Sequence, residues 1–378
     1  MTKLRVAVVG VGHLGQHHAR VLASIPDVEL VGVADARIEQ ARAVAEKNGT
    51  RAFADYRELL DLVDAVSVAV PTALHLEIAS AFLERGIATM VEKPLATSLD
   101  EAERIVALAR AHNAVLQVGH IERFNPALSV LEGLHLRPKY IAAERLSTYT
   151  FRSTDIGAVL DIMIHDIDLI LSMIAAPVRS VAAVGVSIFG GHEDVANARV
   201  EFDDGCVVNL TASRASYQSL RRMRLWGEEG YATLDFAAKQ GTIVRPSEGL
   251  RRGVLDLEGV DMTKPAEVKD RLFGKILRID QVQAEGREPL ALELEEFVRA
   301  ISEGARPKVG GDEALRAMRL ADQILQQINT HQWEGVATGP VGPHLQPATA
   351  PEPTSALRGP ISWRNRNARK GSSKPSNS

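Results

Sequence analysis

The chain has 378 residues, of which 45% are hydrophobic and 24% charged, with a formal net charge of −4. This balance predicts a globular protein with a sizeable core, and the length favours two domains. The small net charge gives no overall field toward nucleic acid or membrane, and no apolar run reaches the roughly eighteen residues that a membrane span needs. The single cysteine, Cys206, and the lack of a signal-peptide pattern favour a cytoplasmic protein.

Strands and helices are expected to alternate through residues 1–120. Short apolar, β-branched runs predict strands at 4–9, 28–34, 65–70, 87–91 and 114–118. Helical spacing between them predicts helices at 13–24, 37–47, 72–84 and 99–111. This alternation is typical of a doubly wound parallel sheet, so the fold class is α/β with an N-terminal Rossmann domain.

The pattern changes in residues 121–334, where a long apolar helix is followed by several strands. The helix is predicted at 158–174, the strands at 178–188, 198–202, 207–213, 223–226 and 231–236, and two closing helices at 292–302 and 313–328. We expect an α+β domain for substrate binding and oligomerisation, with a largely antiparallel open sheet. Residues 335–378 are rich in Pro, Gly and Ser and are predicted to form a disordered tail. The tail is basic, but without a stacking platform we predict no nucleic-acid partner.

A glycine-rich motif, Gly10-Val-Gly12-His13-Leu14-Gly15, follows the first strand and opens the first helix. Gly10 permits a tight turn, Gly12 lets the backbone approach a pyrophosphate, and Gly15 allows close packing of helix and strand. The free N–H groups of the helix start would bind the phosphates. The motif therefore predicts a dinucleotide site, in whose loop His13 and Leu14 lie. His13, His17 and His18 are expected to be exposed or packed on the first turn.

Asp35 ends the second strand, where an acidic side chain can accept hydrogen bonds from the adenosine ribose. A carboxylate there would repel a 2′-phosphate, so NAD is favoured over NADP. Arg37 lies close enough in sequence to pair with such a phosphate instead. Asp35 could also serve as a helix N-cap.

Two later segments carry candidate chemistry. Lys93 follows a predicted strand at the edge where ligands bind in such sheets, and a lysine there can assist deprotonation of a hydroxyl. Asp161, His165 and Asp168 are spaced i, i+4, i+7, so they share one face of an otherwise apolar helix. That stripe predicts an acid/base site, a metal site or a structural hydrogen-bond cluster.

Over residues 4–330 the sequence resembles the glucose–fructose oxidoreductase/inositol 2-dehydrogenase (Gfo/Idh/MocA) family. The resemblance rests on the glycine motif, Pro71-Thr72-Ala-Leu-His75, Glu92-Lys93-Pro94, Asp161-x-x-x-His165 and the segments 293–298 and 307–312. It implies that Lys93, Asp161 and His165 are catalytic and that no metal is needed. It also places Pro71, Thr72, His75, Glu92 and Lys93 beside the cofactor. Met163 stands where that family commonly has glycine, which leaves the shape of the substrate open.

The resemblance implies a nicotinamide-dependent dehydrogenase acting on a secondary hydroxyl. His165 would take the hydroxyl proton, Lys93 would hold the oxygen, and Asp161 would orient or polarise the pair. All three would contact substrate. The cofactor would be NAD, with NADP the lesser candidate.

Residues 119–126, Gly-His-Ile-Glu-Arg-Phe-Asn-Pro, resemble the branch of the family that oxidises UDP-N-acetylglucosamine at the 3-hydroxyl. Arg123 could pair with a diphosphate and Asn125 could bind a sugar or amide. Alternatively, Arg123 forms a salt bridge between domains and Asn125 starts a helix. Other candidate functions are a free-sugar or inositol dehydrogenase or reductase, and a non-catalytic NAD-sensing regulator. A homodimer or homotetramer formed through the open sheet is expected.

Overall fold

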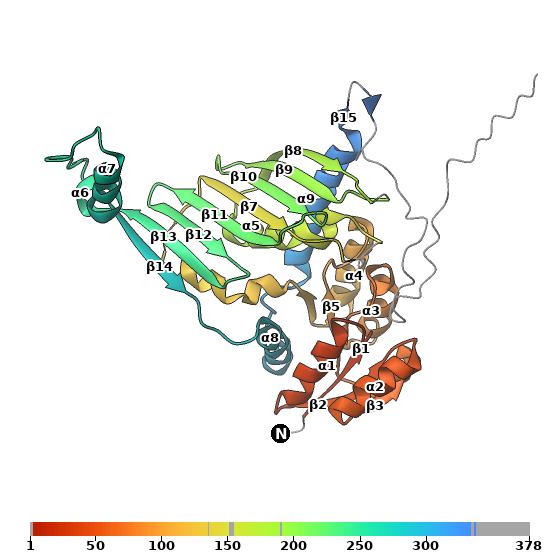
Figure 1. Cartoon of the computed structure of the whole chain (residues 1–378). Helices are drawn as coiled ribbons and strands as arrows, with labels where there is room; N and C mark the ends of the chain where they lie inside the picture. Colours follow the sequence, from red (N-terminus) through yellow and green to blue (C-terminus); the bar gives the residue numbers. More distant parts are fainter. Residues whose placement is uncertain (1–2, 135, 151–154, 190, 334–335, 338–378) are drawn as a thin grey trace, which may run out of the picture.

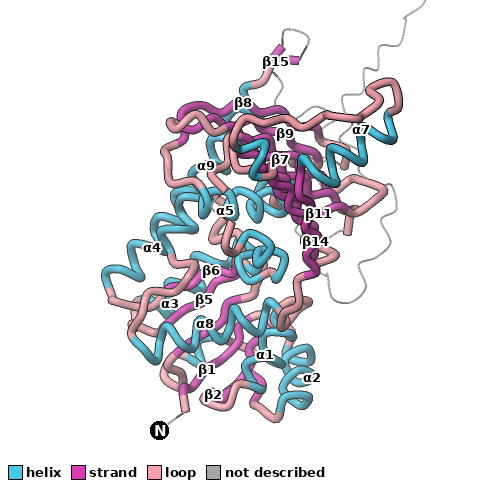
Figure 2. The backbone as a smooth tube through the Cα atoms, turned by 90° about the vertical axis from the view of Figure 1, so that its left-hand side faces the viewer, coloured by secondary structure: helices cyan, strands magenta, loops and turns pink. Residues whose placement is uncertain are grey.

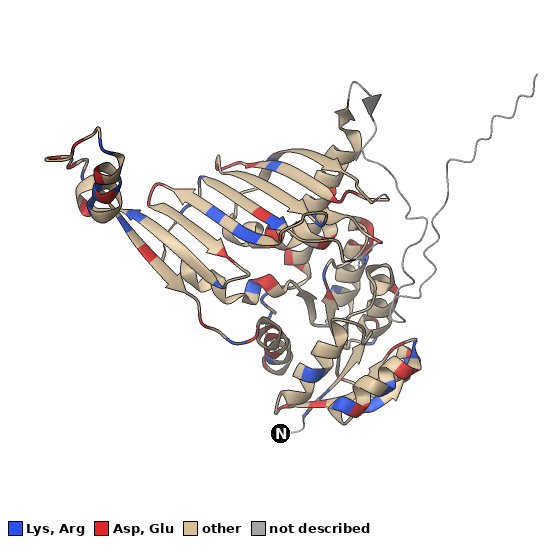
Figure 3. Ribbon diagram, in the orientation of Figure 1, with Lys and Arg blue, Asp and Glu red and all other residues tan. Residues whose placement is uncertain are grey.

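The computed structural model describes residues 3–134, 136–150, 155–189, 191–333 and 336–337. They form two large sheets with helices packed on them (Figure 1). Acidic and basic positions are interspersed along both layers, in keeping with the small net charge (Figure 3). None of the helices described is long and apolar enough to span a bilayer.

The first sheet is parallel throughout. Its strands are β1 (Leu4–Val9), β2 (Val28–Ala34), β3 (Arg51–Phe53), β4 (Ala65–Val68), β5 (Ala88–Glu92) and β6 (Leu116–Gly119). They lie in the order β3-β2-β1-β4-β5-β6. The helices between them are α1 (Gly15–Ser24), α2 (Ile38–Asn48), α3 (His75–Leu83) and α4 (Leu99–Ala111), with 3-10 turns η1 (Tyr56–Leu59) and η2 (Thr72–Leu74). This strand order is that of a Rossmann sheet, which confirms the predicted fold.

The second sheet has eight described strands. These are β7 (Tyr140–Leu146), β8 (Val178–Val186), β9 (Val195–Phe202), β10 (Val207–Ser213), β11 (Leu220–Gly227), β12 (Gly230–Asp235), β13 (Gln240–Pro246) and β14 (Leu277–Gln283). Their order is β14-β13-β12-β11-β7-β10-β9-β8. The pairing of β7 with β10 is parallel and the others are antiparallel, so the prediction of a largely antiparallel sheet is confirmed.

Helices cover one face of the second sheet. A π-helical turn, η5 (Val159–Met163), leads into α5 (Ile164–Met173), and α5 packs against α9 (Gly311–Thr330), which lies on β8. The chain enters this layer through two 3-10 turns, η3 (Ile121–Phe124) and η4 (Pro126–Leu131). The shorter elements are α6 (Glu248–Arg251), α7 (Pro265–Arg271), the π-turn η6 (Leu272–Ile276), and the strands β15 (Gln332–Trp333) and β16 (Val336–Ala337). The segment with α6 and α7 projects from the β13–β14 end of the sheet (Figure 1).

Helix α8 (Pro289–Glu303) follows the second sheet in sequence but packs on the first. Its Leu294 and Phe297 are fully buried in a hydrophobic cluster with Val6 and Val8 of β1. Figure 2 shows α8 lying beside α1 and β1. Residues from the second half of the chain therefore complete the core of the first sheet.

Candidate active site

The glycine loop between β1 and α1 has the geometry that a pyrophosphate site requires. Gly10 has a φ of +83°, and a Cβ on Gly15 would lie 1.8 Å from the backbone oxygen of Gly10. A Cβ on Gly12 would meet nothing within 4 Å, so open space lies in front of that residue. No side chain caps the start of α1, and Leu14 at that position is 48% exposed. The helix therefore keeps backbone N–H donors available for phosphate oxygens.

Asp35 holds the glycine loop at the end of β2. Its Oδ2 accepts a hydrogen bond from the Val11 backbone N–H (3.1 Å), and its Oδ1 accepts one from the Arg37 N–H (2.9 Å). The Arg37 Nε lies 3.5 Å from the same Oδ1. The N-cap of α2 is Arg37, so the N-cap role considered for Asp35 is wrong. A carboxylate has about four acceptor positions, so Asp35 can still accept from a ribose. These residues fit a dinucleotide.

Lys93, which directly follows β5, reaches across to the second layer. Its Nζ lies 2.6 Å from the backbone oxygen of Asp161 and 3.2 Å from the Asp161 Oδ1. Both side chains are mostly buried, with 14% and 24% of their surface exposed. Asp161 lies in the π-helical turn η5, directly before α5. The fold thus brings together two of the three residues that the motifs identified as catalytic.

His165 lies in the first turn of α5. It is partly buried, and so are Lys93 and Asp161. Its Nδ1 is buried and has no hydrogen-bond partner among the residues described. Burial, followed by the positive charges of Lys93 and Arg145, holds the pKa of His165 well below its usual range. The imidazole is therefore neutral near pH 7, which is the form that can accept a proton.

Asp168 occupies the third position of the predicted stripe and has different partners. Its Oδ2 lies 2.9 Å from the Arg123 Nε and 3.9 Å from the His120 Nδ1. No group of three or more His, Cys, Asp or Glu residues in the described chain has the arrangement of a metal site. The stripe is therefore divided: Asp161 pairs with Lys93, whereas Asp168 belongs to a buried ion pair.

The two residues considered for substrate binding after β6 are engaged within the protein. Asn125 Nδ2 donates to Glu122 Oε2 (2.8 Å) and to the Phe236 backbone oxygen (3.2 Å), while its Oδ1 accepts from the Ala127 N–H (3.0 Å). Asn125 is the N-cap of η4. Together with the Arg123–Asp168 pair, these contacts favour the helix-start and salt-bridge alternatives, and the substrate-binding roles stay predictions.

His75 links the loop after β4 to the loop that carries Lys93. Its Nδ1 lies 3.0 Å from the Pro94 backbone oxygen, and its Nε2 lies 3.0 Å from the Val70 backbone oxygen. The side chain is buried, and burial lowers its pKa. Of its neighbours in the motif, Thr72 is buried and Pro71 is exposed. His75 therefore fixes the course of the backbone beside Lys93.

Glu92 contacts a histidine that the sequence did not single out for the site. His18 is buried, with Nδ1 at 2.8 Å from the Ser67 Oγ and Nε2 at 3.0 Å from the Glu92 Oε1. Burial alone would raise the pKa of Glu92, but His18 and Lys93 together lower it. His13 and His17 are exposed, whereas His18 is buried. Both predicted environments, solvent exposure and packing on the first turn of the helix, therefore occur among these three histidines.

Glu193 supports the turn that carries Asp161, a role for which the sequence offered no motif. Its Oε1 accepts a hydrogen bond from the Val159 N–H (2.9 Å), and its backbone oxygen accepts one from the Ala158 N–H (2.8 Å). A Cβ on Gly157 would lie 2.1 Å from that Oε1. The glycine ahead of the Asp-x-x-x-His motif therefore makes room for a carboxylate that holds the helix start.

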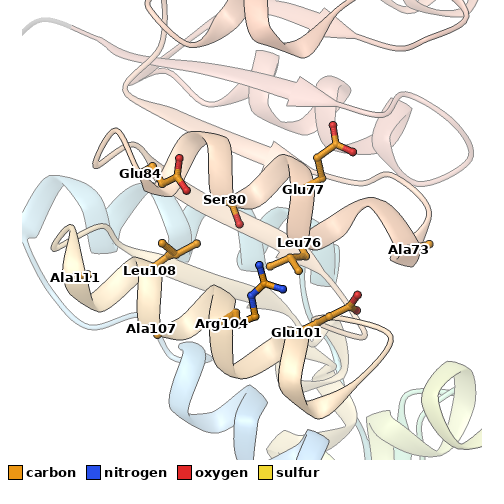
Figure 4. A pocket seen from close by; sticks show the side chains of 10 residues that line it. All are labelled: Ala73, Leu76, Glu77, Ser80, Glu84, Glu101, Arg104, Ala107, Leu108 and Ala111. Atoms are coloured by element: carbon orange, nitrogen blue, oxygen red, sulfur yellow. The ribbon is translucent and has the colours of Figure 1, made fainter.

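A surface groove lies between α3 and α4 (Figure 4). Its lining includes Leu76, Glu77, Arg104 and Leu108. None of the residues predicted for the catalytic or cofactor site lines it. The groove is therefore separate from the Lys93–Asp161 site.

Known proteins match both parts of this architecture. A family model described as "Oxidoreductase family, NAD-binding Rossmann fold" matches residues 4–120, and the GFO/IDH/MocA C-terminal domain matches residues 131–233. UDP-N-acetylglucosamine 3-dehydrogenase from Acidithiobacillus ferrooxidans is 35% identical over 305 residues, which cover 80% of this chain and 90% of that protein. A structure of that enzyme has a TM-score of 0.76 at 33% identity and covers 86% of this chain and 98% of the other.

More distant relatives act on other polyols and sugars. The scyllo-inositol 2-dehydrogenase (NAD(+)) of Bacillus subtilis is 29% identical over 267 residues, covering 65% of this chain and 78% of that enzyme. Levoglucosan dehydrogenase in complex with NADH and levoglucosan shares the fold, with a TM-score of 0.73 at 19% identity, covering 86% of this chain and 97% of the other. With the glycine loop and the Lys93–Asp161 contact already established, these matches show that the chain belongs to the Gfo/Idh/MocA family of NAD-binding oxidoreductases.

Proposed function

We propose that this protein oxidises a secondary hydroxyl of a sugar nucleotide with NAD, and that UDP-N-acetylglucosamine is converted to its 3-keto form. The observation that carries the chemistry is the Lys93 Nζ held by Asp161, together with a neutral His165. The similarity to UDP-N-acetylglucosamine 3-dehydrogenase supports the choice of substrate. A protein that only senses NAD would have no chemical need for these three groups.

Each residue has a distinct part in the proposed reaction. The nicotinamide ring, when bound, supplies the acceptor for the substrate hydride. His165 is neutral, so it can take the hydroxyl proton as the carbon–oxygen double bond forms. The Lys93 ammonium donates a hydrogen bond to the same oxygen and stabilises its developing negative charge. Asp161 holds the ammonium group in place through its side chain and backbone oxygens.

Activity measurements on two catalytic variants test this assignment. With UDP-N-acetylglucosamine and NAD, followed by nicotinamide absorbance, Lys93→Met and His165→Ala should each lose about 10²–10⁴-fold in kcat. Their NAD affinity should stay unchanged, because the glycine loop and Asp35 bind the other end of the cofactor. Lys47→Met and His112→Ala, both at exposed positions, are the matched controls.

Two outcomes would contradict the proposal. A folded His165→Ala protein with full activity would show that the histidine has only a structural role. If the enzyme turned over free sugars or inositol but not UDP-N-acetylglucosamine, the proposed substrate would be wrong, although the proposed oxidation of a secondary hydroxyl would be supported.

The cofactor preference follows from Asp35. Its carboxylate lies beside the glycine loop, where it would repel a 2′-phosphate, so NAD should bind more tightly than NADP. Asp35→Ser keeps a hydrogen-bond acceptor but removes the charge, and it should narrow the difference between the two cofactors. Fluorescence titration of wild type and variant with both cofactors measures this. Tighter binding of NADP by the wild type would mean that Arg37 controls the pocket.

We further propose that the protein assembles as a homodimer or homotetramer through the outer face of the second sheet. This face carries Tyr140, Trp226 and Tyr231 on adjacent strands, with ring centroids 5.0 Å and 6.3 Å apart. A row of large aromatic rings on an open sheet supports contact with a second copy.

A further inference from the structure

Buried polar atoms without hydrogen-bond partners gather next to the catalytic residues. In the described part of the chain nine buried side-chain nitrogen and oxygen atoms lack one, and six of these belong to five residues that contact or influence one another. These residues, here called the rear cluster, are Gln117, His120, Arg123, Asp168 and Glu293. Two of the six atoms, Arg123 Nε and Asp168 Oδ2, form an ion pair at 2.9 Å, whereas Gln117 Oε1 and both Glu293 oxygens have no hydrogen-bond or ion-pair partner among the residues described. Such atoms are rare in folded proteins, so their presence here indicates bound water or shared protons.

Contacts between different elements hold the rear cluster together. Gln117 Nε2, on β6, donates to the backbone oxygen of Glu293 on α8 at 2.8 Å. The Arg123 Nε, in η3, lies 2.9 Å from the Oδ2 of Asp168 on α5. The Nδ1 of His120, the residue directly before η3, lies 3.9 Å from the same oxygen. The cluster therefore joins α8 and the first sheet to the helix that carries His165.

Glu293 is the member with the most unusual environment. The residue has no exposed surface, and neither carboxyl oxygen has a hydrogen-bond partner among the residues described. An unpaired carboxylate in such a place would be very costly. Burial, followed by the negative charges of Glu92 and Asp168, raises the pKa of Glu293 well above its usual range. A protonated, neutral carboxyl group at this position avoids the cost of a buried, unpaired charge.

The two carboxylates that act on Glu293 are each close to a catalytic residue. Glu92 directly precedes Lys93, and its Oε2 accepts a hydrogen bond from the Lys93 N–H (3.1 Å). Asp168 lies on α5, three residues after His165. Each carboxylate also has basic partners: His18 lies next to Glu92, while Arg123 and His120 lie next to Asp168. Because the charges of both carboxylates act on Glu293, a proton donor there would act on both sides of the site.

We propose that Glu293 is a positioning residue that stays a neutral carboxylic acid and shares its proton, through buried water, with Glu92 and Asp168. The shared proton keeps both carboxylates in the orientations that place Lys93 and His165 for reaction. The effect on turnover rests on the proposed function, whereas the protonation state of Glu293 does not.

An infrared measurement tests the protonation state without any substrate. The wild type at pH 8 should show the C=O band of a protonated carboxyl group, and Glu293→Gln should lack that band. Glu303→Gln, which changes an exposed residue on the same helix, should keep it. Identical spectra of wild type and Glu293→Gln in this region would overturn the inference. Because no sugar is used, this result cannot be confused with failure of the proposed function.

Turnover tests the positioning role. Glu293→Gln keeps a hydrogen-bond donor and should retain kcat and its pH profile. Glu293→Leu removes the donor, so kcat should fall about 10- to 100-fold and the acid limb of the profile should move to higher pH. Glu303→Leu is the control. Equal profiles for wild type and Glu293→Leu, or a loss in Glu293→Gln as large as in Glu293→Leu, would contradict the role. If Glu293→Leu does not fold, the pH profile of Glu293→Gln still tests the positioning role, and the infrared spectra still test the protonation state.

Discussion

His165 shows how a single side chain links the chemistry of the site to the stability of the fold. An ordinary histidine takes up a proton as the pH falls below about 6.5. In the folded protein burial and the charges of Lys93 and Arg145 oppose that proton. Between pH 6.5 and the lower pKa of the folded state, the unfolded chain binds more protons. Stability therefore falls with falling pH in this window.

A histidine substitution makes this effect measurable. His165→Gln removes the titrating group, so the free energy of unfolding should depend less on pH below 6.5. The slope should differ from that of the wild type by about 1.4 kcal/mol per pH unit. Denaturant unfolding at several pH values gives the slopes, and His112→Gln, at an exposed position, is the control. The same slope in His165→Gln and wild type would show that His165 is protonated in the folded state.

Motifs could identify the residues that we propose meet the substrate, but they could not identify the residues that hold those side chains in place. Lys93 and Asp161 stand in local patterns with a chemical meaning, so sequence reasoning selected them, and the structure places them in contact. His18 follows the glycine motif and Glu293 opens the segment 293–298, but neither residue stands in a pattern that assigns it a chemical role. His18 contacts Glu92 because α1 packs against the first sheet, and Glu293 is buried because α8 packs there too. That packing leaves no local signal in the sequence.

The same distinction applies at the scale of elements. The β2 and α4 segments carry clear periodicity, and their predicted bounds, 28–34 and 99–111, agree with the structure. Strand β7 was not predicted, because Arg145 occupies one of its inward positions and hides the alternation. Arg145 is tolerated there since Asp166 binds it at 2.7 Å and 3.1 Å and Glu122 binds it at 2.7 Å. The predicted helix at 158–174 begins instead with the π-helical turn η5.

A substitution at Gly157, just before the π-helical turn η5, tests whether this turn positions Asp161. Gly157→Ala would place a Cβ against the Glu193 carboxylate, so the turn that holds Asp161 must shift. We expect a loss of about 1–3 kcal/mol in stability and a lower kcat, with NAD affinity retained. Gly274→Ala is the control, since a Cβ there meets nothing within 4 Å. Thermal unfolding and steady-state kinetics check this, and a Gly157→Ala enzyme with normal kcat would exclude the coupling.

At the scale of the whole molecule, the proposed assembly depends on the open face of the second sheet. On this face Trp226 lies between Tyr140 and Tyr231 in the row of aromatic rings, and it stacks on Tyr140. If a second copy covers this row, Trp226→Asp should shift sedimentation toward a single chain of 41.0 kDa while the far-ultraviolet spectrum stays unchanged. Tyr217→Asp, at a position that is 94% exposed, is the control. A wild type that sediments only as a single chain at micromolar concentration would contradict the proposed assembly.

The return of α8 to the first sheet has a consequence for the order of folding during synthesis. Leu294 and Phe297 share a buried cluster with Val6 and Val8, although almost 300 residues separate them along the chain. A ribosome has therefore made both sheets before the helix that completes the first one emerges. Until then the nascent N-terminal half has an apolar surface without its final cover. We expect a fragment of residues 1–120 to need chaperones or to aggregate, because it lacks the helix α8 that covers this apolar surface in the whole protein.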